Sequence, residues 1–217
     1  QSSRRPRSPR RPAPGRPGRS ESPVRPSAVH GRRGGRRGAC GSRDDPSVGH
    51  PHNPVGRCWD EGELRQLADF AAKNDLIVCS DEIHCDLVLD QNCKHIPFAS
   101  LNAEAAKRTL TLMAPSKTYN IAGLNCAFAI TSNPEIRAKL AKIMRGLFSD
   151  INIFGIAACQ AALTQGGAWR GELLDYLRIN RDLVLSELAN LTGLKVTIPE
   201  ATYLAWIDGR ELCAQYQ

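Results

Sequence analysis

Residues 76–84 read LIVCSDEIH, and residues 109–117 read TLTLMAPSK. The first stretch begins as a short continuous apolar run, which is typical of a strand buried on both faces of a sheet. The second is a further strand that ends in Pro-Ser-Lys. Helical patterns precede the first strand and follow the second, and such alternation predicts a mainly parallel sheet covered by helices on both faces. The sequence therefore predicts an α/β fold.

The segment before the first strand has the pattern of an amphipathic helix over residues 60–74. One apolar face of this helix would hold Leu64, Leu67, Ala68 and Ala71. Asp60 can cap the helix, and Glu63 three residues later completes a capping box. We therefore expect the helix to begin immediately after Asp60.

The same alternation continues towards the C-terminus. Further strands are predicted over residues 126–132, 195–198 and 203–207. Further helices are predicted over residues 134–147, 154–165 and 169–191, the first with a proline at its first position and the last stopped by Gly193. We expect two partial domains, a large one over residues 50–172 and a smaller C-terminal one over residues 173–217.

The N-terminal segment differs from the rest of the chain in composition and charge. Residues 1–45 hold 13 Arg, no Lys and three acids, so they carry +10, whereas the remaining residues carry −3 of the total +7. Because they have almost nothing apolar to bury, the 45 residues are predicted to be disordered. We place the end of the disordered segment at residue 49. Residues 43–50 (RDDPSVGH) do not have the pattern of a strand.

Three interpretations of this basic segment stay open. It is a stretch that is not native to the protein, an inert tail, or a tail whose arginines bind nucleic-acid phosphates. The absence of lysine beside so many arginines favours the first interpretation, because GC-rich DNA read in an unintended frame has this bias. A nucleic-acid partner is the least favoured of the three.

Composition also excludes some classes of protein. No apolar run approaches the about 20 residues that a membrane-spanning helix needs, and no apolar core of a secretory signal is present near the N-terminus. The eight cysteines include no CxxC pair, so we expect reduced, mostly buried thiols. These features predict a cytoplasmic protein without a membrane partner.

Candidate site residues follow the two strands of the opening stretches. In parallel sheets, ligands bind beyond the carboxyl ends of the strands. The first strand is followed by Asp81, and the second by Ser116 and Lys117. We therefore expect an acid and an amine to meet at one edge of the sheet.

Four motifs in the right order resemble those of a known family. They are residues 51–57 (PHNPVGR), 80–84 (SDEIH), 114–117 with 120–124 (APSK and NIAGL), and 199–206 (PEATYLAW). They are similar to those of the fold-type-I pyridoxal-phosphate (PLP) enzymes of aminotransferase class I and II, most of all the cystathionine β-lyase branch. The resemblance covers about residues 50–217. It implies the PLP-dependent transferase type I fold, with a large domain and the start of a small C-terminal α+β domain.

The resemblance implies pyridoxal 5′-phosphate as cofactor and assigns its two principal contacts. Lys117 matches the catalytic lysine that binds the cofactor aldehyde and then takes the Cα proton of the substrate. Because its amine must lose a proton to attack, we expect partial desolvation there. Asp81 matches the acid that pairs with the pyridine nitrogen and makes the ring an electron sink.

Further cofactor contacts are implied by the same resemblance. Asn53 matches the residue that hydrogen-bonds the ring 3′ oxygen, and Ser116 matches a phosphate ligand. Ile83 would pack on one ring face, since alternation along an extended segment from Asp81 would place it there. His84 stands where many aminotransferases have a tyrosine, and Asn125 where they commonly have an arginine. Both differences resemble the carbon–sulfur lyase branch.

The implied reaction is β-elimination of a thiol from an amino acid such as cystathionine, which gives pyruvate and ammonia. Two alternatives stay open. One is a PLP-dependent class I/II aminotransferase, and the other is an inactive, incomplete homologue with a basic nucleic-acid-binding tail. The resemblance also implies a homodimer, although the chain lacks matches to the family's upstream strands, phosphate-cradling turn and stacking aromatic. It also lacks a match to the arginine that grips the substrate carboxylate.

Other polar and aromatic residues have structural interpretations. Arg57 is predicted to be an ion-pair partner and Glu82 a structural acid, while His50 and His52 are predicted to be solvated. Tyr203 and Trp206 are predicted to lie in the core of the small domain. The clustered acids, His84 and Cys85 of residues 81–86 resemble a metal site, but neighbouring strand residues point to opposite faces, so no metal is predicted there.

Overall fold

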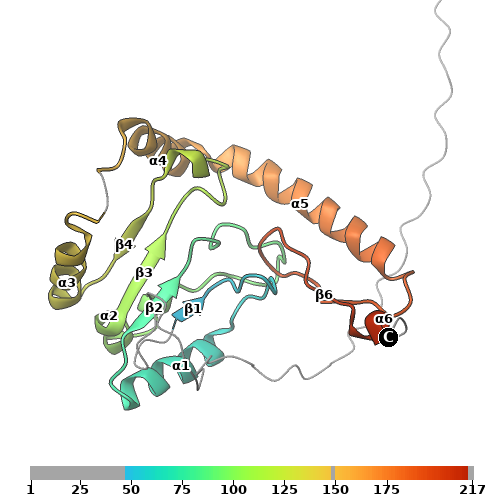
Figure 1. Cartoon of the computed structure of the whole chain (residues 1–217), viewed down its shortest axis with the longest axis horizontal. Helices are drawn as coiled ribbons and strands as arrows, with labels where there is room; N and C mark the ends of the chain where they lie inside the picture. The colour runs from blue at the N-terminus through green and yellow to red at the C-terminus, as the bar shows by residue number, and fades with distance from the viewer. Residues whose placement is uncertain (1–46, 148–149, 215–217) are drawn as a thin grey trace, which may run out of the picture. The chain divides into compact units, whose positions relative to one another are not determined.

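The computed structural model describes residues 47–147 and 150–214 (Figure 1). The predicted disorder of residues 1–45, and Cys40 within them, lie outside this part of the chain.

A four-stranded sheet forms the centre of the fold. Its strands lie in the order β1 (Ser47–Gly49), β2 (Val78–Asp81), β3 (Thr109–Met113) and β4 (Phe128–Ile130). The first three strands are parallel, and β4 pairs antiparallel with β3. The predicted mainly parallel sheet is therefore confirmed, with one antiparallel edge strand.

Strand β1 corrects one prediction. Residues 43–50 have no strand pattern, but Ser47 pairs with Cys79 and Gly49 with Asp81. Val48 supplies a single buried side chain, and the carbonyl of Gly49 accepts a hydrogen bond of 3.0 Å from Nε1 of Trp59. A strand this short is held by its neighbour rather than by its own pattern, so the ordered domain already includes residues 47–49, which the predicted boundary assigned to disorder.

Helices lie around this sheet, and two short helical turns accompany them. The α-helices are α1 (Glu61–Lys73), α2 (Ala103–Arg108), α3 (Pro134–Met144), α4 (Ile153–Gln165), α5 (Gly167–Leu188) and α6 (Arg210–Ala214). The short 3₁₀ turns are η1 (Phe98–Ser100) and η2 (Ala122–Leu124). The four helices predicted from the sequence are confirmed with small shifts at their ends, whereas α2 and α6 were not predicted.

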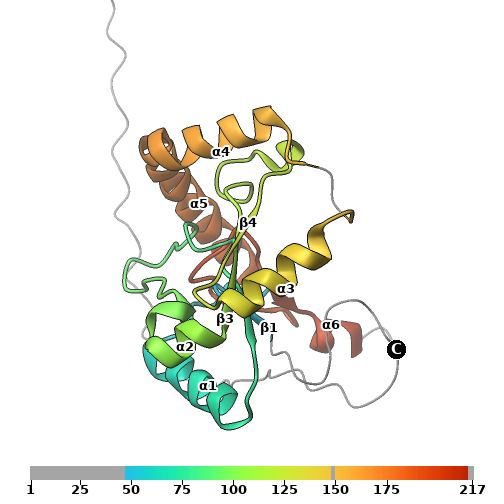
Figure 2. The same cartoon turned by 90° about the vertical axis from the view of Figure 1, so that its left-hand side faces the viewer.

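Helix α1 shows how sequence sets an element and its packing. The carboxylate of Asp60 accepts a 2.8 Å hydrogen bond from the backbone N–H of Glu63, and the Glu63 carboxylate accepts one from the Asp60 N–H. This is the predicted capping box. The apolar face of α1 packs beside α2 (Figure 2). The core so formed contains Val48, Leu64, Ala68, Ala71, Val78, Phe98, Leu101 and Ala105.

The C-terminal strands are shorter than predicted. Strand β5 (Lys195–Val196) pairs antiparallel with β6 (Ile207–Asp208). The segment between them bends to pair with other loops, and Thr202 adopts a left-handed φ of 67°. Tyr203 and Trp206 are 46% and 50% exposed. Their predicted place in a core is therefore wrong, and the Tyr203 ring instead lies edge-on to the His84 ring, with centroids 6.0 Å apart.

The cysteines also differ from expectation. The seven cysteines within the described residues are free thiols, and only Cys58 among them is buried. The prediction of mostly buried thiols is wrong, since five of the others are half-buried and Cys213 is exposed.

Candidate active site

Two parallel strands end side by side at the predicted edge. Asp81 is the last residue of β2 and pairs with Leu112, near the end of β3. The chain then turns through residues 115–120, which carry Ser116 and Lys117. Asn53 lies in the turn after β1, the strand on the other side of β2. The three parallel strands thus bring Asn53, Asp81 and Lys117 to their carboxyl ends.

His84 lies within the electrostatic reach of both key groups. Its side chain is buried, and burial lowers the pKa of its ring below the usual value. The carboxylate of Asp81 opposes this shift of the His84 pKa, and the ammonium of Lys117 adds to it. Both charges therefore act on the His84 ring, and they belong to residues at or just beyond the ends of the adjacent strands β2 and β3.

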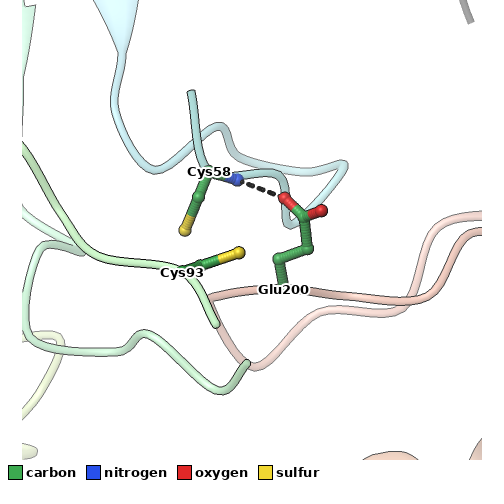
Figure 3. Close-up of side chains that lie close together, drawn as sticks. All are labelled: Cys58, Cys93 and Glu200. Carbon is green, nitrogen blue, oxygen red and sulfur yellow. Dashed lines mark hydrogen bonds between the residues drawn. The ribbon is translucent and has the colours of Figure 1, made fainter. Parts of the chain in front are cut away.

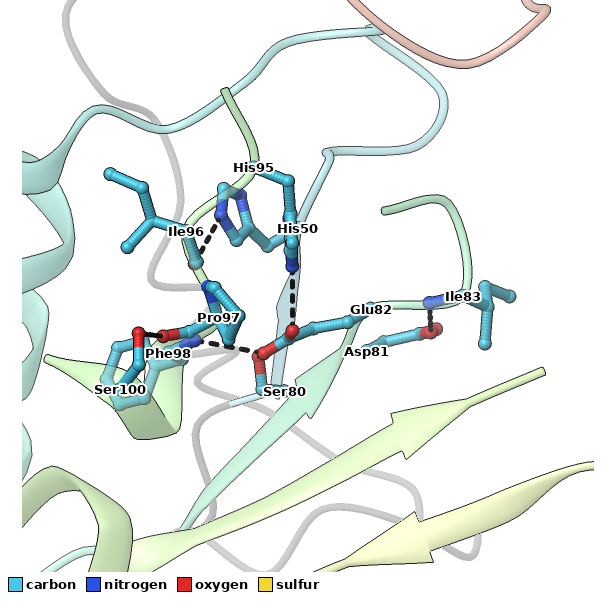
Figure 4. A network of polar contacts seen from close by, with 10 residues as sticks. All are labelled: His50, Ser80, Asp81, Glu82, Ile83, His95, Ile96, Pro97, Phe98 and Ser100. Carbon is cyan, nitrogen blue, oxygen red and sulfur yellow. Dashed lines mark hydrogen bonds and ion pairs between the residues drawn. The ribbon is translucent and has the colours of Figure 1, made fainter. Parts of the chain in front are cut away.

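Asp81 and Ile83 are joined by a local turn. The backbone N–H of Ile83 donates a 3.3 Å hydrogen bond to Oδ1 of Asp81 (Figure 4). Strand β2 ends at Asp81, and residues 83–86 form a turn. The extended alternation that was expected to aim Ile83 at a ring face is therefore wrong, although Ile83 remains next to Asp81. The turn lets the Asp81 carboxylate cap the loop that carries His84.

Lys117 is more exposed than the sequence suggested. Its side chain is solvent-exposed, Ser116 is half-buried and Thr118 is buried. The described residues leave the Lys117 side chain open to solvent rather than partly desolvated, because Lys117 lies on a turn beyond the end of β3. Stacking of the Tyr119 ring on Trp169 of α5, with centroids 5.8 Å apart, anchors this turn.

A buried polar network lies behind the site, and sequence reasoning found only part of it. The Glu82 carboxylate accepts hydrogen bonds from Ser80 Oγ (2.8 Å) and the Phe98 N–H (3.0 Å), and lies 2.8 Å from Nε2 of His95 (Figure 4). Burial acts to raise the pKa of Glu82, but these three hydrogen bonds together hold it below its ordinary value. The prediction of a structural acid is confirmed.

His50 corrects a second prediction. It was expected to be solvated, but it is fully buried. Its backbone N–H donates a hydrogen bond to the Asp81 carbonyl, and Nε2 of its ring lies 2.9 Å from the Ile96 carbonyl oxygen. The physical reason is β1, which carries His50 into the core directly after its last residue. Burial, and secondarily the nearby His95, lower the pKa of His50 to about 4. His52 is only half-buried.

Arg57 has the predicted structural role. It forms an ion pair of 2.5 Å with Glu63 of α1, and its guanidinium lies 5.4 Å from the centre of the Trp59 ring. This pair fastens the turn containing Asn53 to the start of α1.

A separate cavity of about 140 Å³ lies between α5 and the segment 199–205. Apolar side chains such as Leu89, Leu177 and Val184 line it together with Tyr203. None of the predicted cofactor residues lines it, so it is not the site at the strand ends. Among the described residues, no helix is both long enough and apolar enough to cross a membrane.

Family, sequence and structure comparisons of this chain with known proteins agree with one another. Residues 47–216 match the model of the family "Aminotransferase class I and II". The cystathionine beta-lyase PatB of Bacillus subtilis is 40% identical over 171 residues, which are 76% of this chain and 44% of PatB. The chain thus spans less than half the length of this relative.

Solved structures agree with the sequence matches. The crystal structure of OvoB has a TM-score of 0.77 and 45% identity, covering 78% of this chain and 45% of that one. Cystalysin from Treponema denticola, whose structure contains pyridoxal 5′-phosphate, has a TM-score of 0.75 and 35% identity over 78% of this chain and 43% of its own. The predicted PLP-dependent transferase type I fold is therefore confirmed, and the chain belongs to the aminotransferase class I and II family of PLP-dependent enzymes.

Proposed function

We propose that this chain carries the cofactor-binding residues of a PLP-dependent carbon–sulfur β-lyase, which eliminates a thiol from an amino acid such as cystathionine to give pyruvate and ammonia. One observation carries the proposal. The adjacent parallel strands β2 and β3 bring Asp81 and Lys117 to one edge of the sheet, where both charges act on the buried ring of His84.

The residues at this edge have the chemistry that PLP requires. Lys117 offers an amine for the cofactor aldehyde, and Asp81 offers a carboxylate for the pyridine nitrogen. Asn53 and His84 offer hydrogen bonds to the ring oxygen, Ser116 offers a hydroxyl to the phosphate, and Ile83 offers an apolar contact to the ring. When bound, PLP supplies an electron sink for the bond broken at the substrate Cα.

His84 has a protonation state suited to this place. Since burial lowers the pKa of His84, the ring is neutral at pH 7 and donates one hydrogen bond without adding positive charge beside Lys117. With the cofactor bound, the carboxylate of Asp81 would keep the pyridine nitrogen protonated. The amine of Lys117 would take the proton from the substrate Cα, a Cα–Cβ double bond would form, and the thiolate would leave Cβ with the electron pair of the broken C–S bond.

Two residues favour lyase chemistry over transamination. His84 replaces the tyrosine and Asn125 replaces the arginine that aminotransferases commonly have, and PatB, at 40% identity, is a cystathionine beta-lyase. An aminotransferase shares every step as far as loss of the Cα proton, so it is the second candidate. An inactive homologue with a basic nucleic-acid-binding tail is the third candidate.

Assembly and location are part of the same proposal. Large apolar side chains on α4 are exposed, among them Ile153 at 75% and Phe154 at 74%. These side chains support burial against another chain, and a homodimer in the cytoplasm is the assembly that the family resemblance favours. Light scattering of the purified chain would give its mass, and a monomer at all concentrations would contradict the dimer.

Incubation with cystathionine and PLP tests the reaction. The lyase proposal predicts pyruvate without any added keto acid, and no pyruvate from a Lys117→Ala variant of equal fold content. Strict dependence on a keto acid would establish the aminotransferase instead. If the chain binds PLP through Lys117 but releases no product with or without a keto acid, the inactive homologue is correct.

A further inference from the structure

Three potential metal ligands converge in a place that the proposed function does not use. The Sγ atoms of Cys58 and Cys93 and a carboxylate oxygen of Glu200 all lie within 4.8 Å of one another (Figure 3). Cys58 is buried, and the other two are half-buried. Residues from three distant parts of the chain thus point their sulfur and oxygen atoms into one small volume.

Backbone hydrogen bonds hold the three segments together. The Gly56 carbonyl accepts hydrogen bonds from the N–H groups of Glu200 (2.7 Å) and Ala201 (2.8 Å). The Glu200 carbonyl accepts from the N–H groups of Leu89 (2.8 Å) and Asp90 (2.9 Å). Because these hydrogen bonds fix the backbone of the three segments, the ligand atoms are held close together before a metal binds.

The Glu200 carboxylate lies beside the two thiols and is held by the backbone. Oε2 of Glu200 accepts a 2.9 Å hydrogen bond from the backbone N–H of Cys58. Within residues 47–147 and 150–214, no lysine or arginine forms an ion pair with Glu200. A partly buried carboxylate beside two thiols gains most from a divalent cation that thiolates prefer.

We propose that Cys58, Cys93 and Glu200 bind one Zn²⁺ ion, which ties the segment 199–201 to the loops around residues 58 and 93. Sulfur and carboxylate ligands around Zn²⁺ stand roughly 3.5–4 Å apart, so small rotations of the side chains close the site. Binding releases two thiol protons to solvent and involves no oxidation. Water fills the fourth tetrahedral position.

The site is independent of the cofactor residues. No metal is predicted within residues 81–86, whereas the ligands of this site come from positions far apart in the chain. None of them is a predicted PLP contact. Loss of zinc and loss of cofactor binding can therefore be separated by substitution.

Zinc binding by the whole chain tests the proposal. Because Cys40 lies outside the described residues and is itself a thiol, every variant carries Cys40→Ala. Metal-free protein is titrated with Zn²⁺, desalted and analysed for bound metal, and its melting temperature is recorded. The proposal predicts one zinc per chain and a higher melting temperature with zinc, since a ligand that binds only the folded state stabilises it.

Matched variants assign the ligands. Cys93→Ser and Glu200→Gln keep size and remove the proposed donors, so they should weaken zinc binding at least about 100-fold and tenfold, respectively. Cys213→Ser, at an exposed thiol, should change nothing. Lys117→Ala should bind zinc as the parent does. Cobalt in place of zinc should give a thiolate-to-metal absorption band that Cys93→Ser abolishes.

Three outcomes would overturn the proposal. The first is less than a tenth of an equivalent of zinc on folded protein. The second is equal zinc binding by the parent, Cys93→Ser and Glu200→Gln. The third is a Cys58–Cys93 disulfide in protein isolated in air, identified by mass spectrometry, together with no zinc binding after reduction, which would make the pair a redox couple.

Discussion

Glu82 is 1% exposed, and its carboxylate lies 2.8 Å from Nε2 of His95. The Glu82→Ala substitution leaves Ser80 Oγ, the Phe98 N–H and the His95 ring without their shared hydrogen-bond partner. It should therefore lower the free energy of unfolding by about 3 kcal/mol. Glu82→Gln keeps one acceptor oxygen and should cost less. Urea denaturation measures both effects. Glu172→Ala, at an exposed residue of α5, is the control and should change the free energy by less than about 0.5 kcal/mol.

Acid should destabilise the fold through the same network. The folded pKa of His50 is about 4, below its usual 6.5, so the unfolded chain binds more protons between these values. Stability should therefore fall as pH drops from 6.5 to 4, by at most about 1.4 kcal/mol per pH unit from this group. The lowered pKa of Glu82 adds a loss below pH 4.5, as the unfolded state protonates first.

Denaturation curves at several pH values separate these contributions. His50→Gln should flatten the slope between pH 6.5 and 4. Gln66→Ala, at an exposed residue of α1 that carries no titrating group, is the control and should leave the slope as it is in the parent. Equal slopes for the parent and His50→Gln would contradict the burial of a neutral His50.

Gly56 should tolerate no side chain. Its φ is +74°, and a Cβ there would lie 2.8 Å from the Ala201 carbonyl oxygen. Gly56→Ala should therefore destabilise the protein by about 1–3 kcal/mol, through backbone strain and loss of the close approach to residues 199–201. Gly171→Ala, in open space on α5, should instead stabilise by up to about 1 kcal/mol. The same sign for both would refute this explanation.

Elements with local signals could be predicted from the sequence. The capping box of Asp60 and Glu63 set the start of α1, and the apolar run ending at Asp81 gave β2. Strand β1 could not be predicted, because three residues with one apolar side chain carry no period and depend on pairing with β2. The burial of His50 depends on that strand and was missed with it.

Some features of the candidate site could likewise be predicted from the sequence, and others could not. Adjacent placement of Asp81 and Lys117 could be predicted, because carboxyl ends of parallel strands share an edge. The position of Ile83 could not, since the strand ends at Asp81 and the turn 83–86 replaces the alternation. The cluster of Cys58, Cys93 and Glu200 had no sequence signal, because its members meet through backbone pairing between distant segments. Residue 56 pairs with residues 200 and 201, and residue 200 pairs with residues 89 and 90.

Covalent attachment of PLP tests the central claim most directly. The whole chain and Lys117→Ala are incubated with PLP and reduced with borohydride, and their peptides are analysed by mass spectrometry. Lys107→Ala removes an exposed lysine of α2 and serves as the matched control. A pyridoxyl group is expected on Lys117 in the parent and in Lys107→Ala, and none at a comparable level in Lys117→Ala. Labelling spread evenly over the exposed lysines, and unchanged by loss of Lys117, would contradict it.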